Sequence, residues 1–331
     1  MLSRVAESLY WMARHIERAE DLTRLLAVNF NALLDTQPEF ALQGWQPLVT
    51  MTGDEKLFTA TYGAATAQSV MEFMLWSPLN PNAVTACINR ARENARSVRE
   101  QISSEMWEHI NRLYFLIGNA NRAAVLSSPA EFFAQVRDGS QAFQGITSAT
   151  LTHGEPYQFI QLGTLLERAD KTARILNAKY IYIERLPRDS AETSLQLIAL
   201  LRSCSAFEPF GRAAKGGMNI ELVVNYLLLD RSFPRAVLFC LNNSLAALEI
   251  IGDNDNTNTY LKTFNPRRTL GRVSADLEYL DIHEVLGEGM DPYLQQLLLR
   301  FNTIGDDITR AYFNTRVILP DSRPQQKQQQ Q

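Results

Sequence analysis

The chain has 331 residues, 46% of them hydrophobic, and its 32 Lys and Arg against 36 Asp and Glu leave a formal net charge of −4. This near balance argues against a general polyanion-binding surface, and counts of 16 Gly and 13 Pro exclude a collagen-like or wholly disordered chain. The cysteines Cys87, Cys204 and Cys240 are far apart and form no Cys-x-x-Cys pair. A disulfide scaffold or zinc ribbon is therefore excluded, and a reducing compartment is favoured.

The N-terminal residues carry charges early, with Arg4 and Glu7 interrupting any apolar stretch, so no secretion signal is expected. No run of about 18 uncharged apolar residues occurs, so no membrane-spanning helix is expected either. These observations predict a cytoplasmic protein without membrane contact.

The first predicted element is a long helix over 2–35. Apolar or small side chains recur at steps of three and four from Leu2 to Phe30, and nothing interrupts the pattern before Pro38. At 1.5 Å per residue such a helix is about 45 Å long, enough to form the spine of a bundle.

Three dipeptides downstream place a capping side chain before a proline: Asn80-Pro81, Ser128-Pro129 and Asp291-Pro292. Each predicts a helix start with the proline at the first helical position. Ser128 also has Glu131 three residues later, the pattern of a capping box.

Helical periods follow over 84–102 and 294–308, and the β-branched and aromatic stretch 180–183 continues the phase of the helix before it. A region rich in turn residues lies at 252–266. No strand pair with a hairpin turn is visible. The sequence therefore predicts an all-α, long-helix bundle.

Two blocks of sequence recur in the same order. Residues 9–26 (LYWMARHIERAEDLTRLL) match residues 159–176 (FIQLGTLLERADKTARIL), and residues 73–88 match residues 226–241 at nearly the same offset. We infer a tandem duplication of a helical unit of about 150 residues. The predicted organisation is one domain over 1–320, with pseudo-repeats at about 1–152 and 153–320, one continuous core, and a disordered Gln-rich tail at 321–331.

The matched blocks carry the same charges at helical spacing. The side chains that share each face are Ala13, Glu17, Glu20 and Arg24 in the first block, and Gly163, Glu167, Asp170 and Arg174 in the second. A small residue followed by two carboxylates and an arginine predicts close approach to another helix.

These faces allow three interpretations. One is a structural ion-pair network that fixes helix register across a pseudo-twofold axis. Another is a ligand site in which arginines bind a carboxylate or phosphate. The third is a dinuclear metal site like those of carboxylate-rich bundles. The chain's four histidines do not follow the shared acids at metal-ligand spacing and the arginines would repel a cation, so no metal or cofactor is expected.

Two further charged features occur once each. A stripe on one helix face consists of Asn89, Arg92, Arg96 and Arg99. It is interpreted as a solvated face, an anion-recognition stripe or a partner of the Glu17 and Glu20 face; it is too short, and too poor in aromatic residues, for nucleic acid. Asp230, Arg231 and Arg235 form either a turn with capping charges or an anion site at a helix N-terminus.

The opening string LSRVAESLYWMARHIERAEDLTRLL resembles the alpha-E family, a bacterial all-helical family, and the resemblance extends over about 1–318. The positions that match its recurrent motifs are Arg14, Glu17, Arg18, Glu20, Arg24, Asn89, Arg92, Arg96, Arg99, Glu167, Arg168, Asp170, Arg174, Asp230, Arg231 and Arg235. No catalytic residue is carried over by this resemblance.

What the resemblance implies is a context: members are encoded beside, or fused to, circularly permuted ATP-grasp ligases and transglutaminase-like peptidases. The first hypothesis is therefore an accessory or substrate-holding helical partner of an ATP-grasp peptide or amide ligase, with a peptide-like or anionic small ligand. The alternatives are an enzyme that acts on peptide or amide bonds through the duplicated carboxylates, and a carboxylate-bridged metal-binding bundle.

Overall fold

The computed structural model describes residues 1–34, 44–53, 55–187, 190–214, 217–253 and 264–313. Within these ranges the chain forms helices joined by turns and contains no strand, which confirms the predicted all-α class. None of the described helices is long and apolar enough to cross a membrane. The predicted tail at 321–331 and most of the predicted turn region at 252–266 lie outside the described residues.

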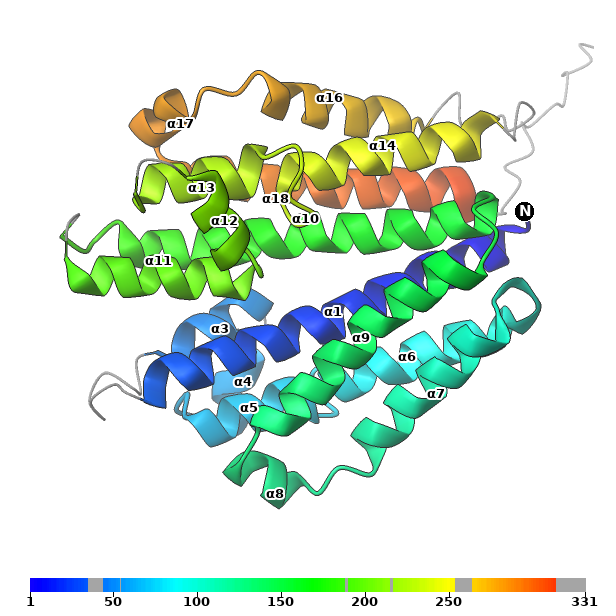
Figure 1. Cartoon of the computed structure of the whole chain (residues 1–331), viewed down its shortest axis with the longest axis horizontal. Coiled ribbons are helices and arrows are strands. Elements are labelled where there is room, and N and C mark those ends of the chain that lie inside the picture. The colour runs from blue at the N-terminus through cyan, green and yellow to red at the C-terminus, as the bar shows by residue number, and fades with distance from the viewer. Residues whose placement is uncertain (35–43, 54, 188–189, 215–216, 254–263, 314–331) are drawn as a thin grey trace, which may run out of the picture.

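The first half of the chain is organised around α1, a helix of 32 residues. Its helices are α1 (Ser3–Leu34), α3 (Gln46–Thr52), α4 (Glu55–Tyr62), α5 (Ala67–Leu75), α6 (Val84–Ser97), η1 (Arg99–Gln101), α7 (Ser104–Gly118), α8 (Arg122–Ser127) and α9 (Ala130–Thr150). α1 packs along α6 and α9, and both of these pack on α7 (Figure 1). The predicted long first helix is therefore confirmed.

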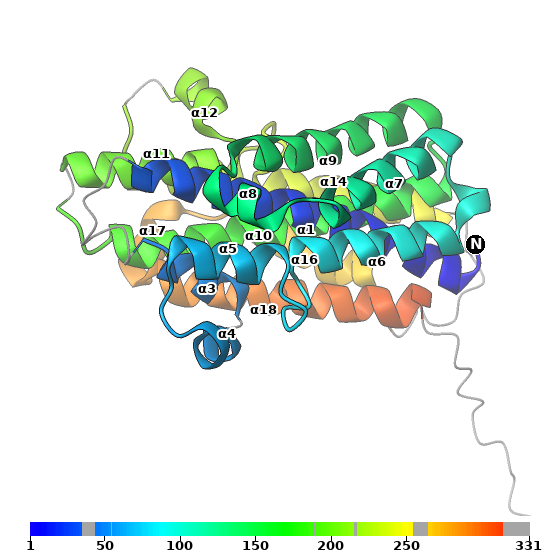
Figure 2. The same ribbon diagram turned by 90° about the horizontal axis from the view of Figure 1, so that it is seen from below.

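The second half is organised around α10, a helix of 29 residues. Its helices are α10 (Glu155–Ile183), α11 (Ala191–Ser203), α12 (Phe207–Ala213), α13 (Ile220–Leu229), α14 (Val237–Asp253), α16 (Pro266–Glu278), α17 (Ile282–Glu288), α18 (Met290–Ile308) and the π-helical turn η2 (Thr309–Phe313). α10 packs on α14 and α18, which α16 covers. Figure 2 shows the short helices α4 and α12 projecting from opposite sides of the molecule.

The two halves meet where α1 packs directly on α10. A Cβ atom placed on Gly163 of α10 would lie 2.4 Å from the backbone oxygen of Tyr10 and 3.3 Å from the Cβ of Ala13, both on α1. Only a glycine allows the two backbones to come this close. The close approach predicted from the shared small residues is confirmed here.

We expect Gly163→Ala to lower the free energy of unfolding by about 1–3 kcal/mol, because the new methyl group would force the helices apart. In an open helix the same change stabilises by up to about 1 kcal/mol. Gly145→Ala in α9 is the matched control, since nothing lies within 4 Å of its Cβ position. Urea unfolding of both variants checks this, and equal stabilisation by the two changes would contradict the tight contact.

The predicted start at Asn80-Pro81 was wrong by three residues. α6 begins at Val84, and its N-cap is Ala83, which makes no side-chain cap. The Asn80 amide instead donates to the Phe73 oxygen at 3.1 Å, and its Oδ1 accepts from the Asn82 backbone at 2.8 Å. Asn80 therefore closes the turn before the helix. α6 also ends at Ser97, short of the predicted 102.

The other two predicted starts are shifted as well. α9 begins at Ala130 with Pro129 as its N-cap and no side-chain cap, so the expected capping box does not form. α18 begins at Met290, before the predicted start, because Gly289 adopts a φ of 114° that ends the preceding turn. Asp291 therefore lies within the first turn of this helix.

The buried apolar side chains of the described residues form two clusters, where one continuous core was expected. One cluster lies within the first half of the chain, between α1 and helices α3 to α9. The other joins α1 and parts of α6, α7 and α9 to α10 and the later helices. α1 contributes to both, so its position controls how the two halves pack.

Candidate functional site

Charged side chains line the contact between α1 and α10. The carboxylates of Glu17, Glu20, Asp21 and Glu167 are at most 1% exposed. An ionised carboxylate withdrawn this far from water destabilises the fold by several kcal/mol unless cations and hydrogen bonds compensate it. Their partners therefore decide what this region can do.

Glu167 of α10 is held by two arginines of α1. Arg14 Nε donates to its Oε2 at 2.7 Å, and Arg18 Nε donates to its Oε1 at 2.6 Å. A second nitrogen of Arg18 reaches Oε2 at 3.0 Å. The remaining Arg18 nitrogen donates to Asn82 Oδ1 at 2.7 Å, so the guanidinium is fully engaged.

Glu17 of α1 is held in the reverse sense by α10. Arg168 Nε donates to Glu17 Oε1 at 2.8 Å, and Gln144 of α9 donates to Glu17 Oε2 at 2.6 Å. The two dipeptides Glu17-Arg18 and Glu167-Arg168 thus exchange partners. Each glutamate accepts from the arginine that follows the other.

Arg235, in the turn before α14, adds a fourth cation to this contact. One of its nitrogens donates to Glu17 Oε1 at 2.8 Å and to Asp21 Oδ1 at 2.9 Å, and another donates to Glu20 Oε2 at 2.8 Å. Its own backbone oxygen accepts from Thr172 of α10 at 2.8 Å. Arg235 therefore ties the second half of the chain to three carboxylates of α1.

Arg24 completes the arrangement. It donates to the carboxylates of Glu20 and Asp21 on its own helix, and its Nε donates to the Ser203 oxygen at the end of α11 at 2.7 Å. Three arginines, counting those at 168 and 235, thus face three buried acids on α1. The cluster therefore holds as many basic groups as acidic groups.

These pairings keep Glu20 and Glu167 ionised. Burial opposes the ionisation of Glu167, but Arg18 and Arg14 outweigh it and hold its pKa well below the ordinary value. Burial also opposes the ionisation of Glu20, and Arg24 and Arg235 nevertheless lower its pKa to about 2. A general acid or base works best with a pKa near the operating pH. Glu20 and Glu167 do not meet that requirement.

Two other buried groups behave differently. Burial raises the pKa of Asp21 to about 7 although Arg24 and Arg235 bond its Oδ1, and no described residue bonds its Oδ2. Burial, followed by the charge of Arg18, lowers the pKa of His15 to about 3. Folding therefore favours a protonated Asp21 and a neutral His15.

These shifts predict opposite pH dependences. The contribution of Asp21 is fully present below its ordinary pKa of 3.8 and is lost as the pH rises to about 7. The contribution of His15 is present above its ordinary pKa of 6.5 and is lost as the pH falls to about 3. Between about pH 4.5 and 6.5 the two slopes cancel in the native chain.

We expect Asp21→Asn to remove this cancellation. The variant should become more stable with rising pH, by about 1.4 kcal/mol per pH unit between about pH 4.5 and 6.5, because only the slope of His15 remains. Denaturant unfolding at three pH values in this range checks the difference. Parallel pH profiles of variant and native chain would show that Asp21 is ionised throughout.

Glu17, Glu20 and Asp21 are the acidic group in the described chain whose ligand atoms lie close enough for a metal ion, within 4.8 Å of one another. All three lie on α1, whereas the sequence pattern paired acids from two helices. Arg235 bonds all three acids, so a divalent cation would have to displace this arginine. No histidine belongs to the group. The donor set fits an arginine cluster better than a metal.

The rest of the predicted α10 face lies beside this cluster. Arg174 Nε donates to Asp170 Oδ2 at 2.8 Å. Lys171 Nζ lies 3.5 Å from Asp170 and 3.5 Å from Glu167. Arg174 thus pairs within its own helix and does not reach across to α1 as the shared spacing suggested.

The stripe begins on α6, with Asn89, Arg92 and Arg96, and ends in η1, with Arg99. Arg92 Nε donates to Asn111 at 2.7 Å, and its guanidinium lies 4.4 Å from the Tyr114 ring centre. Arg96 pairs with Glu93 on its own helix, and Arg99 lies over Trp107. The interpretation of this stripe as a partner of the Glu17 and Glu20 face is therefore wrong.

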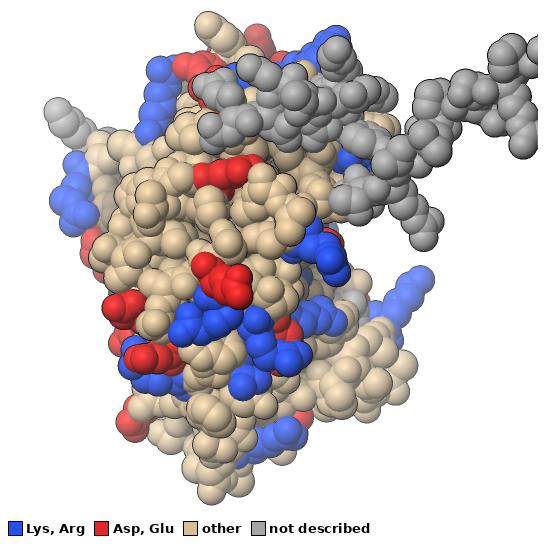
Figure 3. Space-filling model, turned by 90° about the vertical axis from the view of Figure 1, so that its right-hand side faces the viewer, with Lys and Arg blue, Asp and Glu red and all other residues tan. Residues whose placement is uncertain are grey.

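The segment 230–235 divides its charges. Asp230 Oδ1 accepts from the backbones of Ser232 and Phe233 at 2.8 and 2.7 Å, which makes a capped turn. Arg231 pairs with Glu278 on the surface, whereas Arg235 is buried among the acids. On the end of the molecule seen in Figure 3, positive and negative side chains are intermingled.

The three cysteines are buried and unpaired, as expected for core residues. Burial raises the pKa of Cys87 to about 11 and the pKa values of Cys204 and Cys240 to about 12. Thiols that stay protonated in this way are poor nucleophiles.

Sequence reasoning missed five contributors. They are Asp21, Asn82, Gln144, Lys171 and Ser203. Asp21 stands three residues before Arg24, and Lys171 four residues after Glu167, so their helical spacing was a visible signal. No local pattern marks the other three, because only the fold brings them to the contact.

The chain belongs to the Alpha-E family, whose model matches residues 1–313 and is described as a predicted alpha-helical domain with a conserved ER motif. Two ER dipeptides of this chain, Glu17-Arg18 and Glu167-Arg168, are the pairs that exchange partners between α1 and α10.

Three uncharacterised mycobacterial proteins are similar to the chain. One from Mycobacterium bovis and one from Mycobacterium tuberculosis are each 24% identical, and another from Mycobacterium tuberculosis is 23% identical. Each match covers 96% of this chain and 37% of the relative. The chain therefore spans little more than a third of these curated relatives. No solved structure matches it significantly.

Proposed function

We propose that this protein is a non-catalytic helical partner that docks onto an ATP-grasp peptide or amide ligase and holds its substrate. The observation that carries the proposal is the ion pairing of the two shared glutamates. Glu17 and Glu167 are each bonded by two arginines. Such pairs stabilise a defined helix arrangement and leave neither of these two glutamates free to act as an acid or base. The association with a ligase rests on the family resemblance.

The greater length of the relatives supports the same role. In those proteins the matched region occupies 37% of the chain, so it is accompanied by further sequence. A domain that works beside a second domain, or beside a separate partner, fits this organisation. A transglutaminase-like peptidase is the second partner class that the resemblance suggests.

We further propose that the scaffold arose by tandem duplication, with copies at about 1–152 and 153–320. The exchanged Glu–Arg pairs support this, because a pseudo-twofold relation between α1 and α10 would bring each dipeptide to the other. Residue 163, where the second copy has glycine, packs on Ala13, the matching small residue of the first copy.

Co-purification with the ATP-grasp ligase encoded in the same genome tests the docking proposal. We expect a complex, and a ligase that forms less product when this protein is omitted. Ligase activity unchanged by the protein, together with separate elution of the two, would overturn it. Peptide or amide cleavage by this chain alone, lost in Glu17→Gln without loss of folding, would instead establish the enzyme alternative.

A further inference from the structure

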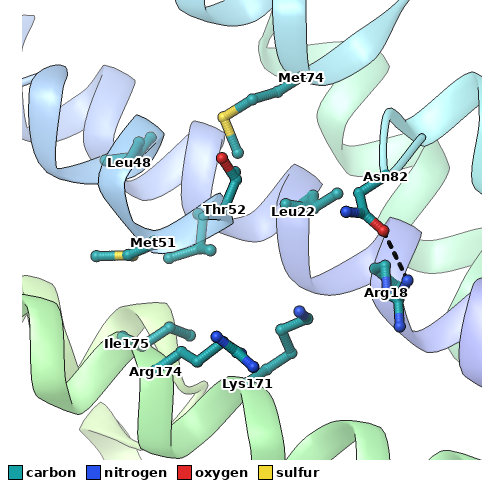
Figure 4. Close-up of a pocket in the computed structure, with 11 residues that line it drawn as sticks. Arg18, Leu22, Leu48, Met51, Thr52, Met74, Asn82, Lys171, Arg174 and Ile175 are labelled. Atoms are coloured by element: carbon teal, nitrogen blue, oxygen red, sulfur yellow. Dashed lines mark hydrogen bonds between the residues drawn. The ribbon is translucent and has the colours of Figure 1, made fainter. Parts of the chain in front are cut away.

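A small pocket opens beside the arginine pairs of Glu167, between α1, α3, the turn before α6 and α10 (Figure 4). Its volume is about 30 Å³. Arg18, Lys171 and Arg174 form its cationic wall, and Leu48, Met51 and Ile175 belong to its apolar wall. Figure 4 shows the Lys171 and Arg174 side chains ending near each other on one side, with Met51 and Leu22 opposite.

The cationic wall carries more positive charge than the acids around it offset. Among the described residues, two acids, Glu167 and Asp170, pair with four cations at 14, 18, 171 and 174. The neighbouring Glu17 cluster has three arginines for three acids, so the described excess of basic over acidic groups lies on this side of the α1–α10 contact. An anion bound here would restore the balance.

Lys171 and Arg174 are the cations of this group that an added anion can best reach. Arg174 uses its Nε in the ion pair with Asp170, and Lys171 Nζ is 3.5 Å from its nearest carboxylate oxygens. The side chain of Arg174 is 32% exposed and that of Lys171 is 19% exposed, so both are partly withdrawn from water yet reachable. A partly buried cation with donors beyond those in its ion pair binds anions more strongly than a fully hydrated one.

The shape and the second wall select among anions. A space of about 30 Å³ holds about two waters, the size of a planar carboxylate head group. A guanidinium beside an ammonium suits such a group. The partly exposed Met51 offers an apolar surface for the hydrocarbon that follows the head group, and burying that hydrocarbon adds affinity.

We propose that this pocket binds the carboxylate of an aliphatic acid or of a peptide ending in an aliphatic residue. The head group contacts Lys171 and Arg174, and the hydrocarbon lies on Met51. The biological ligand named here rests on the proposed substrate-holding role, but the pocket itself is a property of the isolated protein. Its chemistry is therefore measurable without any ligase.

Hexanoate is the probe for the test, added to the purified full chain and followed by NMR chemical-shift changes. Hexanol removes the charge, hexylamine reverses it, and inorganic phosphate supplies charge without hydrocarbon. We expect hexanoate to bind at least about tenfold more tightly than each of the three, since one charge-assisted contact is worth about that factor. An acetylated peptide ending in leucine then distinguishes a peptide from a free acid.

Lys171→Met should weaken hexanoate binding about tenfold, because it removes the charge and keeps the side-chain length. Lys56→Met is the matched control, since Lys56 is an exposed lysine of α4 outside the pocket, and it should bind as the native chain does. Arg174→Gln is a second variant in case Lys171→Met folds poorly. Thermal unfolding of each variant separates lost binding from lost structure.

The proposal is overturned if hexanoate and hexanol bind equally, if phosphate binds as tightly as hexanoate, or if folded Lys171→Met and Arg174→Gln both bind like the native chain. Such a result would leave the docking proposal standing. Conversely, a protein that binds hexanoate at this pocket but neither joins nor affects a ligase would keep the pocket and lose its assigned role.

Discussion

Replacing Arg235 by methionine is expected to lower the free energy of unfolding by about 3–5 kcal/mol, the usual effect of leaving buried charge unpaired. Arg235 bonds Glu17, Glu20 and Asp21, and all three acids are almost completely buried. Methionine fills much of the space but offers no donor. Denaturant unfolding followed by circular dichroism measures the change.

Arg231 provides the matched control, four residues earlier in the same segment. Its side chain is 66% exposed, and its partner is Glu278 at 2.7 Å on the surface. Arg231→Met should change the stability by less than about 1 kcal/mol, because exposed ion pairs contribute little. Similar losses in the two variants would mean that the segment as a whole, and not the buried charge, is responsible.

Glu167→Gln is expected to lower the free energy of unfolding by a similar amount, about 3–5 kcal/mol. In this variant the buried charges left unpaired are positive, not negative. Arg14 and Arg18 both bond this glutamate, and neither forms an ion pair with another acid of the described residues. The neutral amide of glutamine can accept a hydrogen bond from one of the two arginines through its oxygen. Its N–H groups then face the donor groups of the other arginine. The variant should therefore unfold at lower denaturant concentration.

A surface glutamate with arginine partners serves as the control. Glu93 of α6 pairs with Arg96 at 2.6 Å and Arg92 at 3.4 Å and is 52% exposed. Glu93→Gln should change the stability by less than about 1 kcal/mol. If Glu167→Gln also proved neutral, the arginine pairs would not compensate a real burial penalty and the structural interpretation would lose its basis.

The sequence predicted the helices better than their ends. Long uninterrupted periodicity identified α1, α10 and α18, because burial of one helix face is encoded in the spacing itself. Helix starts failed at Asn80, Ser128 and Asp291. There, turn hydrogen bonds and a glycine with positive φ compete with capping, and local sequence does not show which of them prevails.

The candidate site was likewise predicted only in part. Small residues and charges at matched helical positions indicated that α1 meets another helix, and Gly163 does contact it. The burial of Arg235 against α1 was not predictable, because those residues are more than 200 positions apart and meet only through the packing of α14 on α10. The same holds for the cation excess, which appears only once each arginine is assigned its acid.

The central claim is that Glu20 and Glu167, between α1 and α10, are permanently ionised parts of a scaffold. The most direct measurement is the ¹³C chemical shift of the Glu167 carboxyl carbon, assigned with the Glu167→Gln variant and followed from pH 8 to the acid limit of folding. Because its pKa is held well below 4.5, we predict a constant shift typical of a carboxylate. A titration between pH 5 and 8 would contradict the account and identify Glu167 as an acid or base suited to catalysis.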